Sequence, residues 1–203
     1  MRAHRKPASA RGWTFPGAPW MPSLLRRVGS IALLALAACG PGTDASRGGT
    51  ILFHDDFNAE NGMVSSANYR HLAQWEVMSG SVDLAGSYPF ELLPPGHGMY
   101  VDLDGATMHA GVVRTRRVLD LAPGTYELSF MLAGSQRVSD PNVVHVSLGS
   151  LLHATYRVPP FATPRWFRLR VVAAQTIHAR IVFAHEGGDN FGALLDDVVL
   201  RRM

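Results

Sequence analysis

The sequence predicts an all-β fold, an antiparallel β-sandwich of the jelly-roll type. Three observations predict it. Apolar and polar residues alternate with a period of two in short runs, Gly, Pro, Asp and Asn separate these runs at intervals of about ten residues, and only residues 67–77 carry a weak helical stripe. About eight to ten strands with this pattern can form two sheets that each bury one face against the other.

The alternation can be followed strand by strand. The first two runs place apolar residues on either side of Asp83 and Asp102, and the longest run extends from Tyr126 to Leu132. A turn at Pro123-Gly124 leads into that run, and a final strand spans Leu195 to Leu200. The residues that we expect to face the core are Val82, Leu84, Val101, Leu103, Tyr126, Leu128, Phe130, Leu132, Val144, Val146, Leu148, Phe167, Leu169, Val171, Ile181 and Phe183.

An export signal precedes these strands. Arg26 and Arg27 lie ahead of a short apolar run at residues 31–38, which is too short to span a membrane and leads to the only cysteine of the chain, Cys39. The segment Leu36-Ala37-Ala38-Cys39 resembles the lipobox of bacterial lipoproteins. That resemblance implies that residues 1–38 are removed and that Cys39 becomes the first residue, anchored in a membrane by fatty acyl groups such as palmitate.

Two alternatives stay open for this segment. An ordinary secretory signal could end in a cysteine by coincidence, although the presence of a single free thiol in an exported chain would then be unexplained. Translation could start at Met21, because Pro7, Pro16 and Pro19 fit a signal poorly, or a long amino-terminal region could precede the apolar run. We expect a bacterial cell-envelope location, and Gly40 after the cysteine mildly favours the outer membrane.

Composition divides the remaining chain into a tether and one domain. Residues 39–50 hold the lipidated cysteine followed by small, polar, turn-forming residues, which is typical of a flexible tether. Residues 51–203 contain no second composition break and no internal repeat. Because no second cysteine exists, this domain cannot form an internal disulfide and must be stabilised by its core.

The charge of the whole chain is misleading. Residues 1–38 carry six of the 19 Lys and Arg and no acid, which leaves 13 arginines against 16 Asp and Glu in the rest. A net charge of −3 gives no basic footprint for a nucleic acid. We therefore expect no nucleic-acid partner.

Five segments follow one another in an order that resembles a known family. They are Trp75-Glu76-Val77, Gly80-Ser81-Val82-Asp83-Leu84, Tyr100-Val101-Asp102-Leu103-Asp104-Gly105, Pro123-Gly124-Thr125-Tyr126-Glu127-Leu128-Ser129-Phe130 and Leu194-Leu195-Asp196-Asp197-Val198-Val199-Leu200. This order is similar to the galactose-binding-like jelly roll of plant cell-wall DUF642 proteins and related secreted bacterial domains. The resemblance implies that fold and a carbohydrate-binding role.

Acidic residues occur at both ends of the domain. Asp55-Asp56 belongs to the first strand and Asp196-Asp197 to the last, and terminal strands of a jelly roll commonly lie side by side. Converging carboxylates repel one another unless a cation neutralises them, and similar carbohydrate-binding jelly rolls often hold a structural Ca²⁺ there. Strand alternation favours Asp56 with Asp197 as ligands. The alternative is that these are solvated carboxylates that discourage edge-to-edge pairing.

A sugar site needs an aromatic plate for the pyranose ring and planar polar groups for its hydroxyls. We expect the ligand-binding residues to include Trp166, Arg114, His145 and Tyr100, since Trp166 shares strand parity with the polar Arg168 and His145 points away from the core. For Trp166 the alternative is core or rim packing, for His145 the alternative is a solvated histidine, and Trp75 is expected to be structural. Further candidate plates and partners are Tyr88, Tyr156, Arg116, Gln136 and Asp140.

Catalytic motifs are missing from the sequence. Eight histidines remain after residue 38, without the HExxH spacing of a zinc site, and no serine lies in a GxSxG elbow. We therefore expect a non-catalytic domain that binds an extracellular or cell-wall glycan. Two alternatives stay open, namely a protein-interaction or structural domain of the envelope and a glycan-active hydrolase or lyase.

Overall fold

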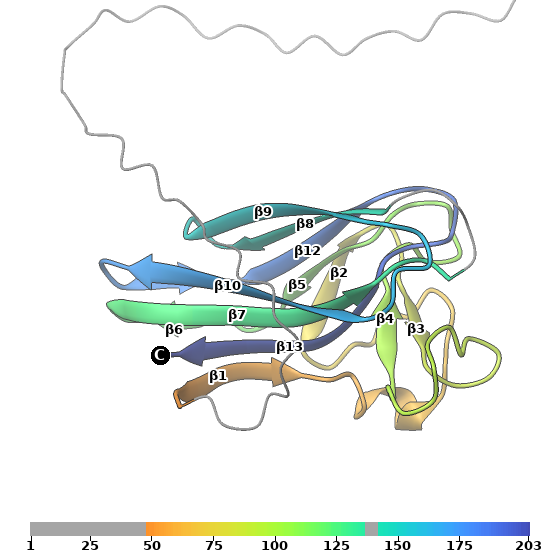
Figure 1. Cartoon of the computed structure of the whole chain (residues 1–203), viewed down its shortest axis with the longest axis horizontal. Helices are drawn as coiled ribbons and strands as arrows, with labels where there is room; N and C mark the ends of the chain where they lie inside the picture. The colour runs from red at the N-terminus through yellow and green to blue at the C-terminus, as the bar shows by residue number, and fades with distance from the viewer. Residues whose placement is uncertain (1–47, 137–141) are drawn as a thin grey trace, which may run out of the picture. The chain divides into compact units, whose positions relative to one another are not determined.

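The structure, a computed structural model, describes residues 48–136 and 142–203, and these form the predicted antiparallel β-sandwich (Figure 1). One 3₁₀ turn, η1 (Glu60–Met63), interrupts the strands. The strands are β1 (Thr50–Asp55), β2 (Trp75–Ser79), β3 (Asp83–Ala85), β4 (Tyr100–Asp102), β5 (Val112–Thr115), β6 (Leu119–Leu121), β7 (Gly124–Ala133), β8 (Asn142–Leu148), β9 (Leu152–Val158), β10 (Arg165–Ala173), β11 (Ile177–Ala179), β12 (Ile181–Glu186) and β13 (Leu194–Arg202).

Two sheets make up the sandwich, and a short pair accompanies them. The first sheet has six strands in the order β10-β7-β13-β4-β3, with β1 also paired to β13. The second has five strands in the order β2-β5-β12-β8-β9, while β6 and β11 form the separate pair. The strand β13 is central in the first sheet, because it pairs with β7 on one side and with β4 and then β1 on the other.

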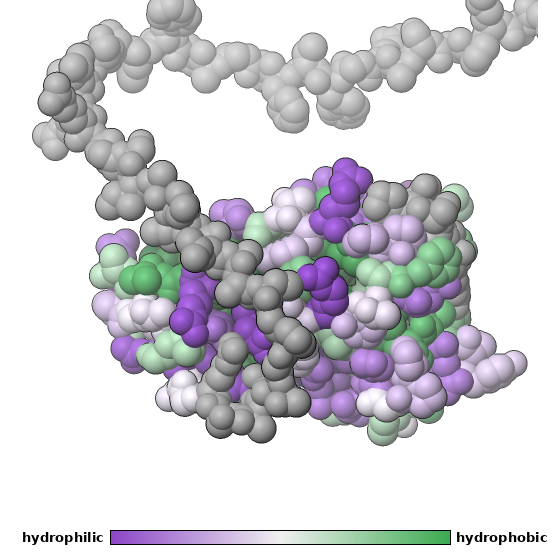
Figure 2. Space-filling model, viewed as in Figure 1, coloured by the Kyte–Doolittle hydropathy of each residue, from purple (hydrophilic) through white to green (hydrophobic). Residues whose placement is uncertain are grey.

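The core lies between the two sheets and includes the residues that the alternation predicts, of which Phe167 and Leu169 are only partly buried. β8 shows the pattern most clearly, since its residues alternate between buried and half-buried along its whole length. Trp75 is fully buried and packs against Phe53 at 5.4 Å and Phe183 at 5.8 Å between ring centroids, which confirms its structural role. On the visible outer surface, hydrophilic and hydrophobic residues are mixed (Figure 2).

Two details differ from the expectation. The weak helical stripe at residues 67–77 is not a helix, because this stretch is irregular until β2 begins at Trp75. The structure also has thirteen strands in its described part, more than expected, since short strands such as β6 and β11 carry too few residues to show an alternation. No helix among the described residues is long and apolar enough to cross a membrane.

The first and last strands pair as predicted. β1 is antiparallel to β13, with Phe53 opposite Leu200 and Asp55 opposite Val198. The register of β13 against β7 shifts between Asp196 and Val199, and Asp197 has a positive φ of 50°. This bulge breaks the strict alternation on which the choice of Asp56 with Asp197 was based.

Candidate functional site

Two of the predicted ligand residues lie together on the outer face of the five-stranded sheet. Arg114 is opposite Val182 and His145 is opposite Ala184, so both face outward on either side of β12. Arg114 forms an ion pair with Glu76 at 2.9 Å. His145 contacts Glu186 through Nε2 at 2.6 Å and Thr155 through Nδ1 at 2.9 Å.

Trp166 lies on the outer face of the other sheet, at its edge strand β10. Phe167, Leu169 and Val171 pack against the core, which leaves Trp166 half-buried on the opposite side, as its parity predicts. The guanidinium carbon of Arg168 lies 5.6 Å from the Trp166 ring centroid.

The neighbours of Trp166 are polar as well as apolar. Its cross-strand partner on β7 is the buried Met131. Further along the same face, Arg170 Nε donates to Glu127 Oε2 at 2.9 Å. We call Trp166, Arg168, Arg170 and Glu127 the Trp166 face; it combines an indole ring with planar hydrogen-bonding groups.

Tyr100 does not offer a surface to a ligand, contrary to the expectation from the sequence. Its side chain is 1% exposed, and its hydroxyl accepts bonds from the backbone N–H of Leu92 at 2.6 Å and Leu93 at 2.9 Å. The same hydroxyl donates to Phe90 O at 3.2 Å. Tyr100 therefore anchors the loop at residues 86–99 over the six-stranded sheet, where it joins a small second cluster with Leu93, Met131 and Leu194.

The predicted ligand residues thus do not converge on a single site. Arg114 and His145 face outward from one sheet and Trp166 from the other. Of the remaining candidates, Tyr156 packs against Phe130 and Phe167, while Tyr88 is 87% exposed. Asp140 and Cys39, the predicted lipidation residue, lie outside the described residues.

The acidic residues of the first and last strands lie near one another, and the charges of the other three affect the pKa of Asp196. Burial, followed by the charges of Asp197, Asp56 and Asp55, raises the pKa of Asp196 to about 8. Asp55 is buried and accepts bonds from the indole N–H of Trp75 at 2.9 Å and from the backbone N–H of Phe57 at 3.0 Å. Burial is the largest effect on its pKa, which is raised.

These acids do not surround a common point. Asp56 accepts a bond from the backbone N–H of Asn58, and Asp196 accepts one from Asp197, so both carboxylates are turned toward their own chain segments. Within residues 48–136 and 142–203, no three His, Cys, Asp or Glu side chains are positioned to hold a metal ion. Calcium at Asp56 and Asp197 therefore stays a prediction.

A second buried acidic group was not anticipated. Burial, and then the charges of Asp83 and Asp104, raise the pKa of Asp102 to about 8, although its Oδ1 accepts bonds from the N–H groups of Asp104 and Gly192. Asp104 Oδ1 and His185 Nδ1 are buried and have no hydrogen-bond partner among the described residues. Gly188 N and Asp189 N donate to Asp104 Oδ2, which joins the loop after β4 to the loop after β12, and no pattern in the sequence pairs these two loops.

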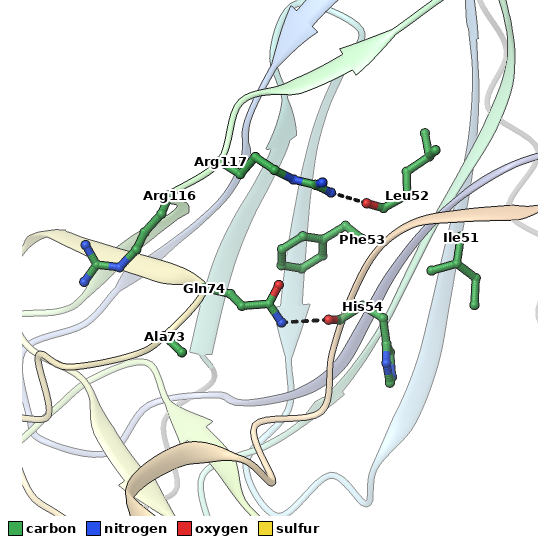
Figure 3. Close-up of a pocket in the computed structure, with 8 residues that line it drawn as sticks. All are labelled: Ile51, Leu52, Phe53, His54, Ala73, Gln74, Arg116 and Arg117. Atoms are coloured by element: carbon green, nitrogen blue, oxygen red, sulfur yellow. Dashed lines mark hydrogen bonds between the residues drawn. The ribbon is translucent and has the colours of Figure 1, made fainter.

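A pocket lies along the edge of β1 that pairs with no described strand (Figure 3). It encloses about 380 Å³, and we call it the β1-edge pocket; its lining residues are Ile51, Leu52, Phe53, His54, Ala73, Gln74, Arg116 and Arg117. Gln74 Nε2 donates to His54 O at 2.8 Å, and Arg117 donates to Leu52 O. These side chains cover carbonyl groups that β1 would otherwise leave open at its edge.

Pairing of β2 with β5 positions the polar side of this pocket. Trp75 is opposite Thr115, which brings Gln74 next to Arg116 just beyond the strand ends, and Arg116 N donates to Gln74 O at 2.8 Å. Arg116 Nε also donates to Leu72 O at 3.1 Å. Sequence reasoning included Arg116 among the candidate polar partners but missed Gln74 and Arg117, because both lie in turns without a pattern of their own.

Comparisons with known proteins give similar β-sandwich domains. The CBM22-1 xylan-binding domain of Paenibacillus barcinonensis Xyn10C is 15% identical, with 78% of this chain and 97% of that chain covered and a TM-score of 0.47. A cleaved adhesin domain of the Lys-gingipain of Porphyromonas gingivalis is 19% identical, with 76% and 99% covered and a TM-score of 0.46. The CBM22-1 and GH10 modules of Clostridium thermocellum Xyn10B, complexed with xylohexaose, are 12% identical, with 76% and 29% covered and a TM-score of 0.43.

No protein-family model matches the chain, and no curated protein matches its sequence. At the identities and TM-scores of the solved structures, the likeness carries no argument about a ligand. The sandwich architecture rests on the strand pairing described above.

Proposed function

We propose that this chain is a non-catalytic glycan-binding domain, presented at the cell envelope. One observation carries the proposal: Trp166 is half-buried on an outer sheet face with the Arg168 guanidinium 5.6 Å from its ring centroid and the Arg170–Glu127 pair on the same face. An indole ring can stack on the apolar face of a pyranose, and the adjacent planar groups can bind its hydroxyls. The ligand would be an extracellular or cell-wall polysaccharide.

A polysaccharide binding screen tests this proposal. The full chain in detergent is titrated with neutral and acidic polysaccharides, and Trp166→Ala is compared with Val172→Ala, a control on the same strand whose side chain is 61% exposed. We expect binding that Trp166→Ala weakens at least tenfold and the control leaves unchanged, while both variants melt like the parent. Absence of binding by the folded parent, or binding indifferent to Trp166, would contradict the proposal.

The membrane anchor is a separate part of the proposal. Its support is the segment Leu36-Ala37-Ala38-Cys39 behind two arginines, with the single thiol of the chain at the expected position. Cells producing the chain are labelled with a palmitate analogue and fractionated. Label that follows the protein and is lost in Cys39→Ser supports the anchor, whereas a parent chain that is released without label rules it out.

Calcium at the terminal strands is a further part of the proposal. Burial is the largest cause of the raised pKa of Asp196, and the like charges of Asp197, Asp56 and Asp55 add to it; these charges support the calcium site, because a bound cation would relieve their repulsion. We expect the melting temperature to rise with calcium and fall with chelator in the parent but not in Asp197→Asn. Equal melting of the parent with calcium and with chelator would exclude a structural calcium.

A second candidate function, binding of an envelope protein, is favoured by one apolar surface. Met63 and Val64 are 52% and 56% exposed, and Tyr88 is 87% exposed. Ser65 and Ser87 join the two loops that carry them, with Ser65 N bonded to Ser87 Oγ at 2.8 Å. Crosslinking in cells from a photoreactive residue at position 88 would favour this function if it captured one envelope protein and Tyr88→Ser abolished the capture.

A further inference from the structure

We propose that one end of the sandwich docks on a membrane surface that contains anionic phospholipids. We call it the tether end, because the tether predicted at residues 39–50 joins the domain there, at Thr50. The inference rests on the membrane anchor proposed above. It leaves the Trp166 face uncovered, since Trp166 is the second residue of β10 and that strand reaches the tether end only at Ala173.

Strand pairing brings the segments of the tether end together. Arg202 on β13 is opposite Thr50 on β1 and Tyr126 on β7, and the last residue of β10 is opposite the first residue of β7. The short strands β6 and β11 pair next to these ends, and Gly149 N donates to Arg180 O at 3.2 Å, which adds the turn after β8. The tether end lies where Figure 1 marks the C-terminus, and its segments are residues 49–52, 116–123, 149–151, 172–180 and 201–203.

Arginines outnumber acids at the tether end. Among its residues only Asp120 has a carboxylate side chain, and His178 contacts that carboxylate at 2.6 Å. Residues 39–203 as a whole contain 13 arginines and 16 acids, so positive charge is concentrated at this end of an acidic domain. The arginines of the tether end are Arg116, Arg117, Arg180, Arg201 and Arg202.

Two acids close to these segments are buried. Glu127 on β7 is 4% exposed and forms its ion pair with Arg170. Glu60, which lies close enough to Arg116 for the charge of that arginine to act on it, is also 4% exposed and accepts the N–H of Ala73 at 2.6 Å. Neither acid presents its charge at the surface of the tether end.

Most of the arginines are held by neutral groups. Arg116, Arg117, Arg180 and Arg202 donate to backbone carbonyl oxygens, and within the described part of the chain none of these four forms an ion pair with a carboxylate. Bonds to carbonyls orient the guanidinium groups without cancelling their charge. Guanidinium groups bind phosphate oxygens through charge-assisted hydrogen bonds, so this end suits the phosphates of lipid headgroups.

Exposed apolar side chains accompany the arginines. Ile51, Val118, Val172 and Met203 are between 43% and 61% exposed, and Ile51 is opposite Arg201 in the register of β1 with β13. Figure 2 shows hydrophobic and hydrophilic residues side by side at this end. A membrane interface favours this combination, because apolar side chains can enter the headgroup region while arginines reach the phosphates.

The tether and the opposite end of the sandwich both favour this orientation. From Cys39, the predicted acylated residue, to Thr50 the chain spans at most about 40 Å when fully extended. Asp83, Asp104 and Asp189 lie at the opposite end, in or next to β3, β4 and the loop after β12. An anionic surface therefore attracts the tether end and repels the opposite end.

Fluorescence quenching on vesicles tests the proposal with the full chain. Val118→Cys places a dye at the tether end, and Met108→Cys places one at an exposed apolar residue of the opposite end. The vesicles carry a quencher on their headgroups and consist of phosphatidylcholine with or without phosphatidylglycerol. On vesicles with phosphatidylglycerol at low salt, we expect quenching at position 118 to exceed that at 108 about threefold or more, and high salt to remove the difference.

Charge variants link the quenching to the arginines. The double variant Arg116→Gln, Arg117→Gln should lower quenching at position 118 to that at 108. Its matched control is Arg70→Gln, Arg157→Gln, which removes two exposed arginines elsewhere, one of which also donates to a carbonyl, Gly80 O at 3.2 Å. Melting curves identify any variant that has lost stability, and Arg202→Gln then replaces the double variant.

Three results would overturn the inference. They are equal quenching at the two positions, a difference that survives loss of the arginines, and a folded chain that does not float with phosphatidylglycerol vesicles in a density gradient. Failure of the anchor is recognised separately, because a Cys39 without acyl groups takes up dye in the parent chain. Such a chain should still show the quenching difference if the tether end docks.

Discussion

Asp55 is a carboxylate buried under an aromatic cluster, and its hydrogen bond to Trp75 links the first strand to the opposite sheet. We expect Trp75→Phe to lower the free energy of unfolding by about 2–4 kcal/mol, because it leaves a cavity and removes a donor from a buried acid. Urea unfolding measures this. Phe53→Leu is the matched control, since it trims the same cluster without removing that donor, and an equal loss in both variants would show that the Asp55 bond adds nothing.

The pKa of Asp196, raised to about 8, predicts a pH dependence of stability. Between the pKa of the unfolded chain and that of the folded one, the folded state binds more protons, so stability is highest at acid pH and falls as the pH rises toward 8. Asp196→Asn removes the titration and should raise stability at pH 9 by about 1–3 kcal/mol, with little change at pH 5.

Urea unfolding at both pH values checks this expectation without added calcium. The exposed Glu91→Gln is the control and should follow the parent at both. A variant Asp196→Asn that keeps the pH dependence of the parent would mean that Asp102, whose pKa is also about 8, or other groups are responsible.

Among the elements, the loop at residues 86–99 depends on one close contact. Gly98 has a φ of 68°, and a Cβ there would lie 2.0 Å from Asn58 Oδ1, which accepts the N–H of Met99. Gly98→Ala should therefore destabilise the protein by about 2–4 kcal/mol. Gly62→Ala is the control, because Gly62 has a φ of 60° and no atom within 4 Å. Similar melting of both variants would mean that backbone strain alone, not the Asn58 contact, sets the cost.

Long strands with strict alternation could be predicted from the sequence, and features made by loops could not. The pattern from Tyr126 to Leu132 predicts the buried face of β7, and the parity of Trp166 predicts its outward side. The same alternation wrongly predicted a regular strand at Asp197, where the structure has a bulge. A bulge depends on the backbone angles of one or two residues and produces no periodic pattern in the sequence. The β1-edge pocket was missed since its arginines come from a turn that only the sheet pairing brings to β1.

For the whole molecule, the most consequential strand is β13, which lies between β7 on one side and β4 and β1 on the other. Removing residues 194–203 should prevent folding, because three strands lose their neighbour and the core loses Leu195, Val198 and Leu200. Circular dichroism should show a disordered chain. Removing residues 201–203 alone should leave a folded protein with a lower melting temperature, and a folded product of the larger deletion would contradict the central role of β13.

The position of β13 also bears on when the sandwich can form. Of all its strands, the central one leaves the ribosome last, so the six-stranded sheet cannot close while the domain is being synthesised. The sheet of the nascent domain therefore stays open until β13 is available, because β1 has no strand to pair with before then. Until β13 is in place, the edges of β1 and β7 to which it pairs stay exposed, and an exposed strand edge can pair with another chain.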